Sequence, residues 1–133
     1  MKYMLLMNYA PIPGVPPVTE WAPEEVKAHM DHMEAISEEL TANGEFVDGQ
    51  GLAGPEVAKI VTHDGVGAPV ITDGPFPESK EFLAGYWLVD VESEERAIEI
   101  AAKTSAAPGP SGRPVAQEMQ VRAVMHGPPD IEL

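Results

Sequence analysis

The chain has 133 residues, a length typical of one domain, and its hydrophobic fraction of 44% is large enough for a folded core. Its formal charge of −14 argues against nucleic-acid binding, because an acidic surface repels phosphate backbones. The absence of cysteine excludes disulfides, thiol nucleophiles and thiolate metal sites. The N-terminal apolar run is shorter than a usual signal peptide, and no segment approaches the ~20 apolar residues of a membrane span. We therefore expect a soluble cytoplasmic protein with no membrane partner.

The first third of the chain predicts a strand, a loop and a long helix. Residues 2–9 predict a strand, in which successive side chains point to opposite faces of the sheet. Both faces are largely apolar, which is typical of an inner strand. The proline-rich segment 10–20 predicts a loop. Pro23 is expected to open the helix, where its missing amide hydrogen costs nothing, and Asn43-Gly44 to end it. The apolar residues expected to face the core at helical spacing are Val26, Met30, Met33, Ile36 and Leu40.

The remainder predicts mainly strands. The expected elements are, in order, a glycine-bearing strand 46–52, a hairpin of 57–62 and 70–72, a long strand 82–91, a helix capped by Ser93, and a strand 115–125. Asp64-Gly65 supplies the hairpin turn. Glycine within the strand, as at Gly49 and Gly51, indicates a bulge or a close approach by another backbone. The long strand is apolar on both faces.

This order predicts an α+β fold, a ferredoxin-like βαββαβ unit with an inserted β-hairpin. We expect residues 1–126 to form one domain and residues 127–133 to form a C-terminal tail. Two helices can cover only one face of the sheet, although its inner strands are apolar on both. The open sheet face is therefore expected to meet a second copy of the chain, which predicts a homodimer.

Residues 73–81 read Asp-Gly-Pro-Phe-Pro-Glu-Ser-Lys-Glu. Turn chemistry explains the first three residues, since glycine adopts a positive φ and proline fixes its own. It does not explain the charges that follow. The run resembles the signature of the DGPF (YCII-related) family, in which Asp-Gly-Pro-Phe precedes an acid, Ser or Thr, Lys and Glu. The resemblance covers most of residues 1–126, most strongly 73–91. It implies two sheets packed as a dimeric α/β barrel, in a family that is mostly uncharacterised.

Two histidines of the predicted helix are candidates for chemistry. His29 lies near the middle of the apolar stripe, where a hydrogen-bonded core residue is the common outcome. His32 lies at its edge and could face a cleft between helix and sheet. The YciI proteins of the same superfamily are proposed to use a helix histidine with an aspartate. The resemblance thus implies His32 and Asp73 as a catalytic pair, although Asp73 also fits an Asx turn.

Five further residues are assigned to substrate binding around that pair: Tyr3, His29, Lys80, Glu81 and Trp87. The two aromatic residues would form the apolar wall, or else belong to the core or the dimer interface. Lys80 stands between acids and could simply pin its loop.

No metal or cofactor is predicted. His29 and His32 lack a third ligand on their helix face, and no nucleotide-binding glycine pattern is followed by a helix. Arg122 is expected to form a salt bridge with Glu118 or Glu99. His63 and His126 receive no role.

Two functional hypotheses remain open. One is a small-molecule enzyme performing proton abstraction or elimination, in which His32 carries the proton and Asp73 acts as base or orients the histidine. The other is a non-catalytic ligand-binding or regulatory module, since DGPF proteins often occur beside extracytoplasmic-function sigma factors. The enzyme requires a cleft that holds His32 or Asp73 with a partner in reach. The module predicts a filled cleft and an exposed apolar patch.

Overall fold

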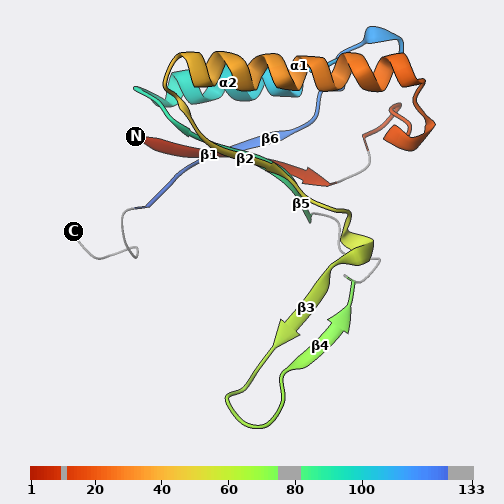
Figure 1. The fold of residues 1–133 in the computed structure, drawn as a ribbon, viewed down its shortest axis with the longest axis vertical. Helices are drawn as coiled ribbons and strands as arrows, with labels where there is room; N and C mark the ends of the chain where they lie inside the picture. The colour runs from red at the N-terminus through yellow and green to blue at the C-terminus, as the bar shows by residue number, and fades with distance from the viewer. Residues whose placement is uncertain (10–11, 75–81, 126–133) are drawn as a thin grey trace.

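The computed structural model describes residues 1–9, 12–74 and 82–125. Figure 1 shows both helices on one side of a four-stranded sheet and a β-hairpin extended away from them. The elements are β1 (Lys2–Tyr9), α1 (Pro23–Ala42), β2 (Phe46–Gly51), β3 (Lys59–Thr62), β4 (Val70–Asp73), β5 (Phe82–Asp90), α2 (Glu94–Ser105) and β6 (Met119–Ala123). The main sheet is antiparallel, with strand order β2-β5-β1-β6. The chain is therefore a mixed α+β protein, compatible with the ferredoxin-like arrangement.

Helix α1 begins and ends where its capping residues predict. Pro23 occupies its first turn, and Glu25 accepts a hydrogen bond of 2.8 Å from the Ala22 amide. Gly44 follows the helix with a φ of +71°, a left-handed value that favours glycine. The prediction that Met30 faces the core is wrong, since it is 58% exposed. The buried residues of α1, Ile36 and Leu40, lie in its C-terminal half. Helix α1 also contacts the short turn at Pro110–Gly112, which follows α2.

The core lies between the sheet and the helices. Tyr3 and Leu5 of β1 stand opposite Val89 and Trp87 of β5, and all four are buried. Helix α2 covers them with Ile100, which is fully buried. Since neighbours across paired strands share a face, these residues define the helix-covered side of the sheet.

Gly49 of β2 lies directly opposite Trp87. A Cβ atom at this position would lie 2.8 Å from Cε3 of the indole, so only glycine leaves room for the ring. The neighbour at Gly49 is a side chain rather than the backbone that the sequence predicted, and the predicted bulge lies in the same strand, between Phe46 and Asp48.

The last strand is shorter than the predicted range 115–125. It spans Met119–Ala123, because Ala116 adopts a φ of +58° that no regular strand allows. Val115 is instead buried, and its amide donates a hydrogen bond of 2.8 Å to the Ala107 carbonyl. The residues before β6 therefore pack beneath the end of α2 rather than extending the sheet.

The inserted hairpin is confirmed, and it forms a sheet of its own. β3 pairs with β4 from Lys59 opposite Asp73 to Thr62 opposite Val70, and every residue of the two strands is exposed. Gly74, just after β4, has a φ of +62°, as turn chemistry predicts. Within the described residues, no helix is long and apolar enough to cross a bilayer.

Candidate functional site

The two helix histidines hydrogen-bond backbone carbonyls at and beyond the end of α2. His29 Nδ1 lies 3.0 Å from the Pro108 carbonyl oxygen, and His32 Nε2 lies 2.8 Å from that of Lys103. Because a carbonyl oxygen only accepts, these ring nitrogens carry the hydrogens. Trp21 packs edge-on against His29, with ring centroids 5.5 Å apart. Both histidines therefore fasten α1 to the chain around the end of α2.

Asp73 lies at the end of β4 and forms an ion pair with Lys59 of β3. Its side chain is 85% exposed. Figure 1 shows the β3–β4 hairpin extended away from α1. The contacts of the described residues join Asp73 to Lys59 and His32 to Lys103, and not to each other. Lys80 and Glu81 lie outside the described residues.

Tyr3 and Trp87 belong to the core rather than to the wall of an open cleft. Their exposed fractions are 7% and 9%. The indole N–H of Trp87 donates a hydrogen bond of 3.0 Å to Thr104 Oγ1 of α2, and Phe46 packs edge-on against the indole at 6.3 Å. Side chains thus fill the space between helices and sheet at these positions.

The other face of the sheet carries a polar pair that sequence reasoning missed. The Tyr86 hydroxyl donates a hydrogen bond of 2.7 Å to Asp48 Oδ2, and the Gln50 amide donates one of 3.3 Å to Oδ1. The bond from Tyr86 lowers the pKa of Asp48 below its usual range, and the same bond raises the pKa of Tyr86. Near neutral pH the carboxylate stays charged and the phenol stays protonated. The pair is therefore suited to binding a charged or hydrogen-bonding group rather than to exchanging a proton.

Two rows of side chains cross this open face, as the strand registers show. We name them the Asp48 row, which is Asp48, Leu88, Met4 and Arg122, and the Gln50 row, which is Gln50, Tyr86, Leu6 and Gln120. Each row runs through β2, β5, β1 and β6 in that order. Both rows have polar ends and a largely apolar centre, in which Met4, Leu6 and Leu88 are only half-buried.

Arg122 at the end of the Asp48 row is exposed and makes no ion pair within the described part of the chain. The predicted salt bridge to Glu118 or Glu99 is wrong. Glu99 pairs instead with Arg96 at 3.3 Å, because both lie one turn apart on α2. Arg122 is left facing outward from the sheet.

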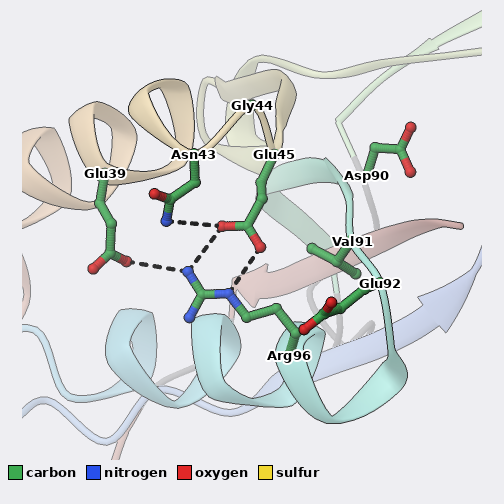
Figure 2. A pocket seen from close by; sticks show the side chains of 8 residues that line it. All are labelled: Glu39, Asn43, Gly44, Glu45, Asp90, Val91, Glu92 and Arg96. Carbon is green, nitrogen blue, oxygen red and sulfur yellow. Dashed lines mark hydrogen bonds and ion pairs between the residues drawn. The ribbon is translucent and has the colours of Figure 1, made fainter.

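A hollow of about 600 Å³ lies between the end of α1 and the start of α2 (Figure 2). Its lining residues are Glu39, Asn43, Gly44, Glu45, Asp90, Val91, Glu92 and Arg96. The lining contains neither a histidine nor a hydroxyl nucleophile, and its ionisable groups are four carboxylates and one guanidinium.

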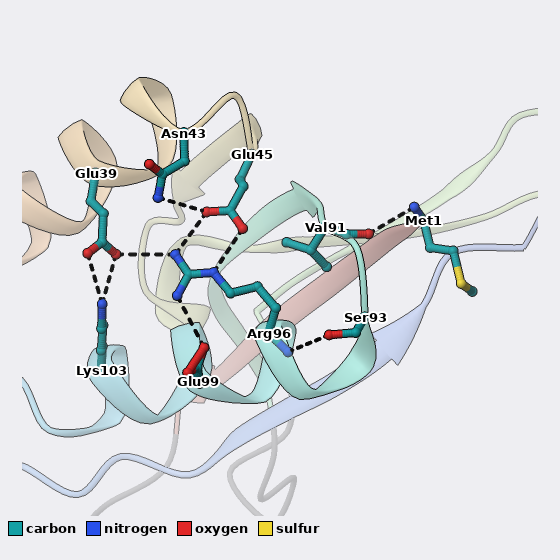
Figure 3. A network of polar contacts seen from close by, with 9 residues as sticks. All are labelled: Met1, Glu39, Asn43, Glu45, Val91, Ser93, Arg96, Glu99 and Lys103. Carbon is teal, nitrogen blue, oxygen red and sulfur yellow. Dashed lines mark hydrogen bonds and ion pairs between the residues drawn. The ribbon is translucent and has the colours of Figure 1, made fainter.

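The charges of this hollow are largely paired with each other (Figure 3). Arg96 donates two hydrogen bonds of 2.8 Å to the carboxylate of Glu45, and Glu39 lies between Arg96 and Lys103. The bidentate contact to Arg96 lowers the pKa of Glu45, and the contact to Lys103 lowers that of Glu39. This network joins α1, β2 and α2, and we assign it a structural role.

A second hollow of about 350 Å³ lies beside the proline-rich segment. Gly14, Val15, Pro110, Ser111, Arg113, Pro114 and Val115 line it. Among the residues that the structure describes, no three acidic or histidine side chains lie close enough together to hold a metal ion.

Two helices lie on one face of a four-stranded antiparallel sheet, and no described element covers the other face. This arrangement defines an α+β protein compatible with the ferredoxin-like class. The family model of the YCII-related domain matches residues 1–112, and the chain belongs to this family. An uncharacterised protein of Rhizobium meliloti (strain 1021) is 30% identical to the chain over 87 residues, which cover 65% of this chain and 69% of that relative. Neither comparison names a reaction or a ligand.

Proposed function

We propose that the protein is a homodimeric, non-catalytic binding module. The observation that carries this proposal is the use of both helix histidines. Each donates to a backbone carbonyl, at 3.0 Å for His29 and 2.8 Å for His32, and the aromatic residues expected to line a cleft are buried. A general acid or base needs a position within reach of a substrate proton. His32 serves a structural contact instead.

The open sheet face supports the dimer. Helices cover one face only, and the other presents Met4, Leu6, Leu88 and the Tyr86–Asp48 pair. Contiguous apolar patches on a soluble protein commonly mark interaction surfaces. Face-to-face packing of two such sheets would form the α/β barrel that the DGPF resemblance implies, and it would shelter both centres from water.

The β3–β4 hairpin supports a further contact with a binding partner. Its exposed aliphatic side chains are Ile60, Val61, Val66, Val70 and Ile71, which are 42% to 79% exposed. From Lys59 to Asp73 the hairpin carries one base, Lys59, and two acids, Asp64 and Asp73, so its formal charge is −1 in a chain of formal charge −14. A weakly charged, apolar arm on an acidic protein suits contact with another protein, such as a regulatory partner.

An acid–base enzyme is the second candidate. It is favoured by Asp73, whose carboxylate is 85% exposed at the base of the hairpin and lies in the run that resembles the DGPF signature. In this alternative Asp73 acts as the base and His32 carries the proton.

Incubation with a metabolite mixture, followed by mass spectrometry over time, separates the two functions. Wild-type protein is compared with the double variant His32→Gln/Asp73→Asn. The glutamine side chain retains an N–H donor for the Lys103 carbonyl, so this variant should fold. We expect no conversion by either protein. Conversion by the wild type that the variant lacks would establish the enzyme and reject the module.

A further inference from the structure

The Asp48 row carries opposite charges at its two ends. Asp48 lies on β2 and Arg122 on β6, and β5 and β1 lie between them. Three strand spacings of ~4.8 Å separate the two backbones by about 14 Å. The two side chains therefore cannot pair within one chain across the apolar centre of the row.

In a dimer whose two-fold axis runs along the strands, Asp48 of one copy can pair with Arg122 of the other. Such an axis, placed between two sheets packed face to face, lays β2 of one copy over β6 of the other and preserves height along the strand. Asp48 then faces Arg122 of the partner subunit, and the reverse contact forms at the other edge. The Gln50 row behaves in the same way, since Gln50 faces the partner's Gln120. Leu88 and Met4 meet their counterparts in the apolar centre.

The alternative two-fold axis, perpendicular to the strands, is less favourable. It lays β2 over β2 of the second copy and reverses height along the strand, so an axis that crosses the Asp48 row brings the two Asp48 carboxylates toward each other. It also brings the two Arg122 guanidinium groups together at the opposite edge. Like charges juxtaposed in an interface oppose association.

We infer that Arg122 of the partner subunit completes the Tyr86–Asp48 pair, at two equivalent places on a dimer whose axis follows the strands. This inference rests on the proposed function, because it presumes the face-to-face dimer. Each place then holds a phenol and a carboxylate from one copy and a guanidinium from the other. The ion pair fixes which way the two sheets are oriented, and it gives exposed Arg122 a partner that the described residues of its own chain do not supply.

Charge exchange tests the pairing. Dimer dissociation constants are measured by sedimentation for the wild type, Arg122→Glu, Asp48→Lys and the double variant Asp48→Lys/Arg122→Glu. Each single change opposes like charges and is expected to weaken the dimer by about tenfold or more. The double variant restores opposite charges and is expected to recover most of that loss. Tyr86→Phe is the control for the lost phenol contact, since it removes that bond while keeping both charges.

Cross-linking tests the axis independently, because the chain has no cysteine of its own. A short bis-maleimide matched to the ~10 Å spacing of packed sheets is applied to Asp48→Cys, Arg122→Cys and the double cysteine variant. We expect covalent dimers from the double variant alone. Efficient cross-linking of Asp48→Cys by itself would indicate the perpendicular axis and overturn the inference.

The outcomes for the inference and for the proposed function are distinct. A monomeric wild type at all accessible concentrations would reject the proposed dimer and the inference with it. A wild-type dimer that is indifferent to Arg122→Glu would reject the inference and leave the dimer standing. Thermal unfolding of every variant, compared with the wild type, confirms that a weakened dimer does not simply reflect an unfolded protomer.

Discussion

The indole N–H of Trp87 donates a 3.0 Å hydrogen bond to the hydroxyl of Thr104, and that hydroxyl donates in turn to the Ile100 carbonyl at 3.0 Å. Trp87 and Thr104 are 9% and 3% exposed, so water cannot replace either partner easily. This short chain of hydrogen bonds connects the longest strand to α2. It is also the reason that Trp87 can be buried with its polar atom satisfied.

Replacement of Thr104 by valine should destabilise the fold by about 1–3 kcal/mol, the usual cost of leaving a buried donor unpaired. The shape of the side chain is nearly unchanged, so the loss reports the hydrogen bond. Urea unfolding followed by tryptophan fluorescence measures it. Thr104→Ser keeps the hydroxyl and is the matched control, expected to lose less. Equal stability of Thr104→Val and wild type would contradict the role of this bond.

Gly49→Ala should destabilise the protein by about 1–3 kcal/mol, because its added methyl group overlaps the indole of Trp87. Gly51→Ala is the control on the same strand, since a Cβ atom there meets nothing within 4 Å. The difference between the two unfolding free energies isolates the clash. If both variants lose equal stability, strand conformation rather than contact with Trp87 requires the glycine.

The Arg96–Glu45 contact predicts a loss of stability in acid. The folded-state pKa of Glu45 lies below its ordinary value of 4.5, because Arg96 hydrogen-bonds the charged carboxylate. The stabilisation is therefore complete above pH 4.5 and is lost as pH falls through the folded-state pKa. The hydrogen bond from Lys103 also lowers the pKa of Glu39, so the protonation of Glu39 in acid should reduce stability as well.

Glu45→Gln should lower stability near neutral pH and flatten its decline below pH 4.5. Denaturant unfolding at several pH values measures this slope. Glu92→Gln is the control, because Glu92 lines the same hollow, is exposed, and makes no ion pair within the described part of the chain. An unchanged slope in Glu45→Gln would show that Arg96 does not bind the carboxylate in solution.

The hairpin should be energetically separate from the rest of the protomer. Val61 and Ile71 face each other across it and are 57% and 60% exposed. Changing both to serine should alter the unfolding free energy of a monomeric protomer by less than about 1 kcal/mol. Leu5→Ala, at a fully buried position, should cost about 2–5 kcal/mol in the same assay. A comparable loss in both variants would indicate that the hairpin packs on its own domain.

Much of the fold could be predicted because its signals are local. Pro23 and Gly44 bound α1, and Ser93 accepts a hydrogen bond from the Arg96 amide at the start of α2. Each of these depends on a few neighbouring residues or on strand alternation. The left-handed Ala116 carries no such signal, and the predicted last strand was therefore too long.

The candidate site depended on contacts that local patterns do not encode. His32 and Lys103 are 71 positions apart, and nothing in the helix pattern shows that the histidine meets a carbonyl. Tyr86 and Trp87 are adjacent aromatic residues on opposite faces of β5. Because both faces are apolar, the sequence does not tell which one the helices cover. Once the covered face is known, the strand registers alone locate Tyr86 beside Asp48.

The projecting hairpin has one more consequence. The residues of both ribbon strands are all exposed, so mainly the ribbon's own few backbone hydrogen bonds keep its amide hydrogens from solvent, and isolated ribbons are only marginally stable. In a lone protomer those amides should exchange rapidly while β1 and β5 remain protected. Slow amide exchange of the ribbon in the assembled protein would then show that the ribbon packs against another surface, even if the partner is not identified.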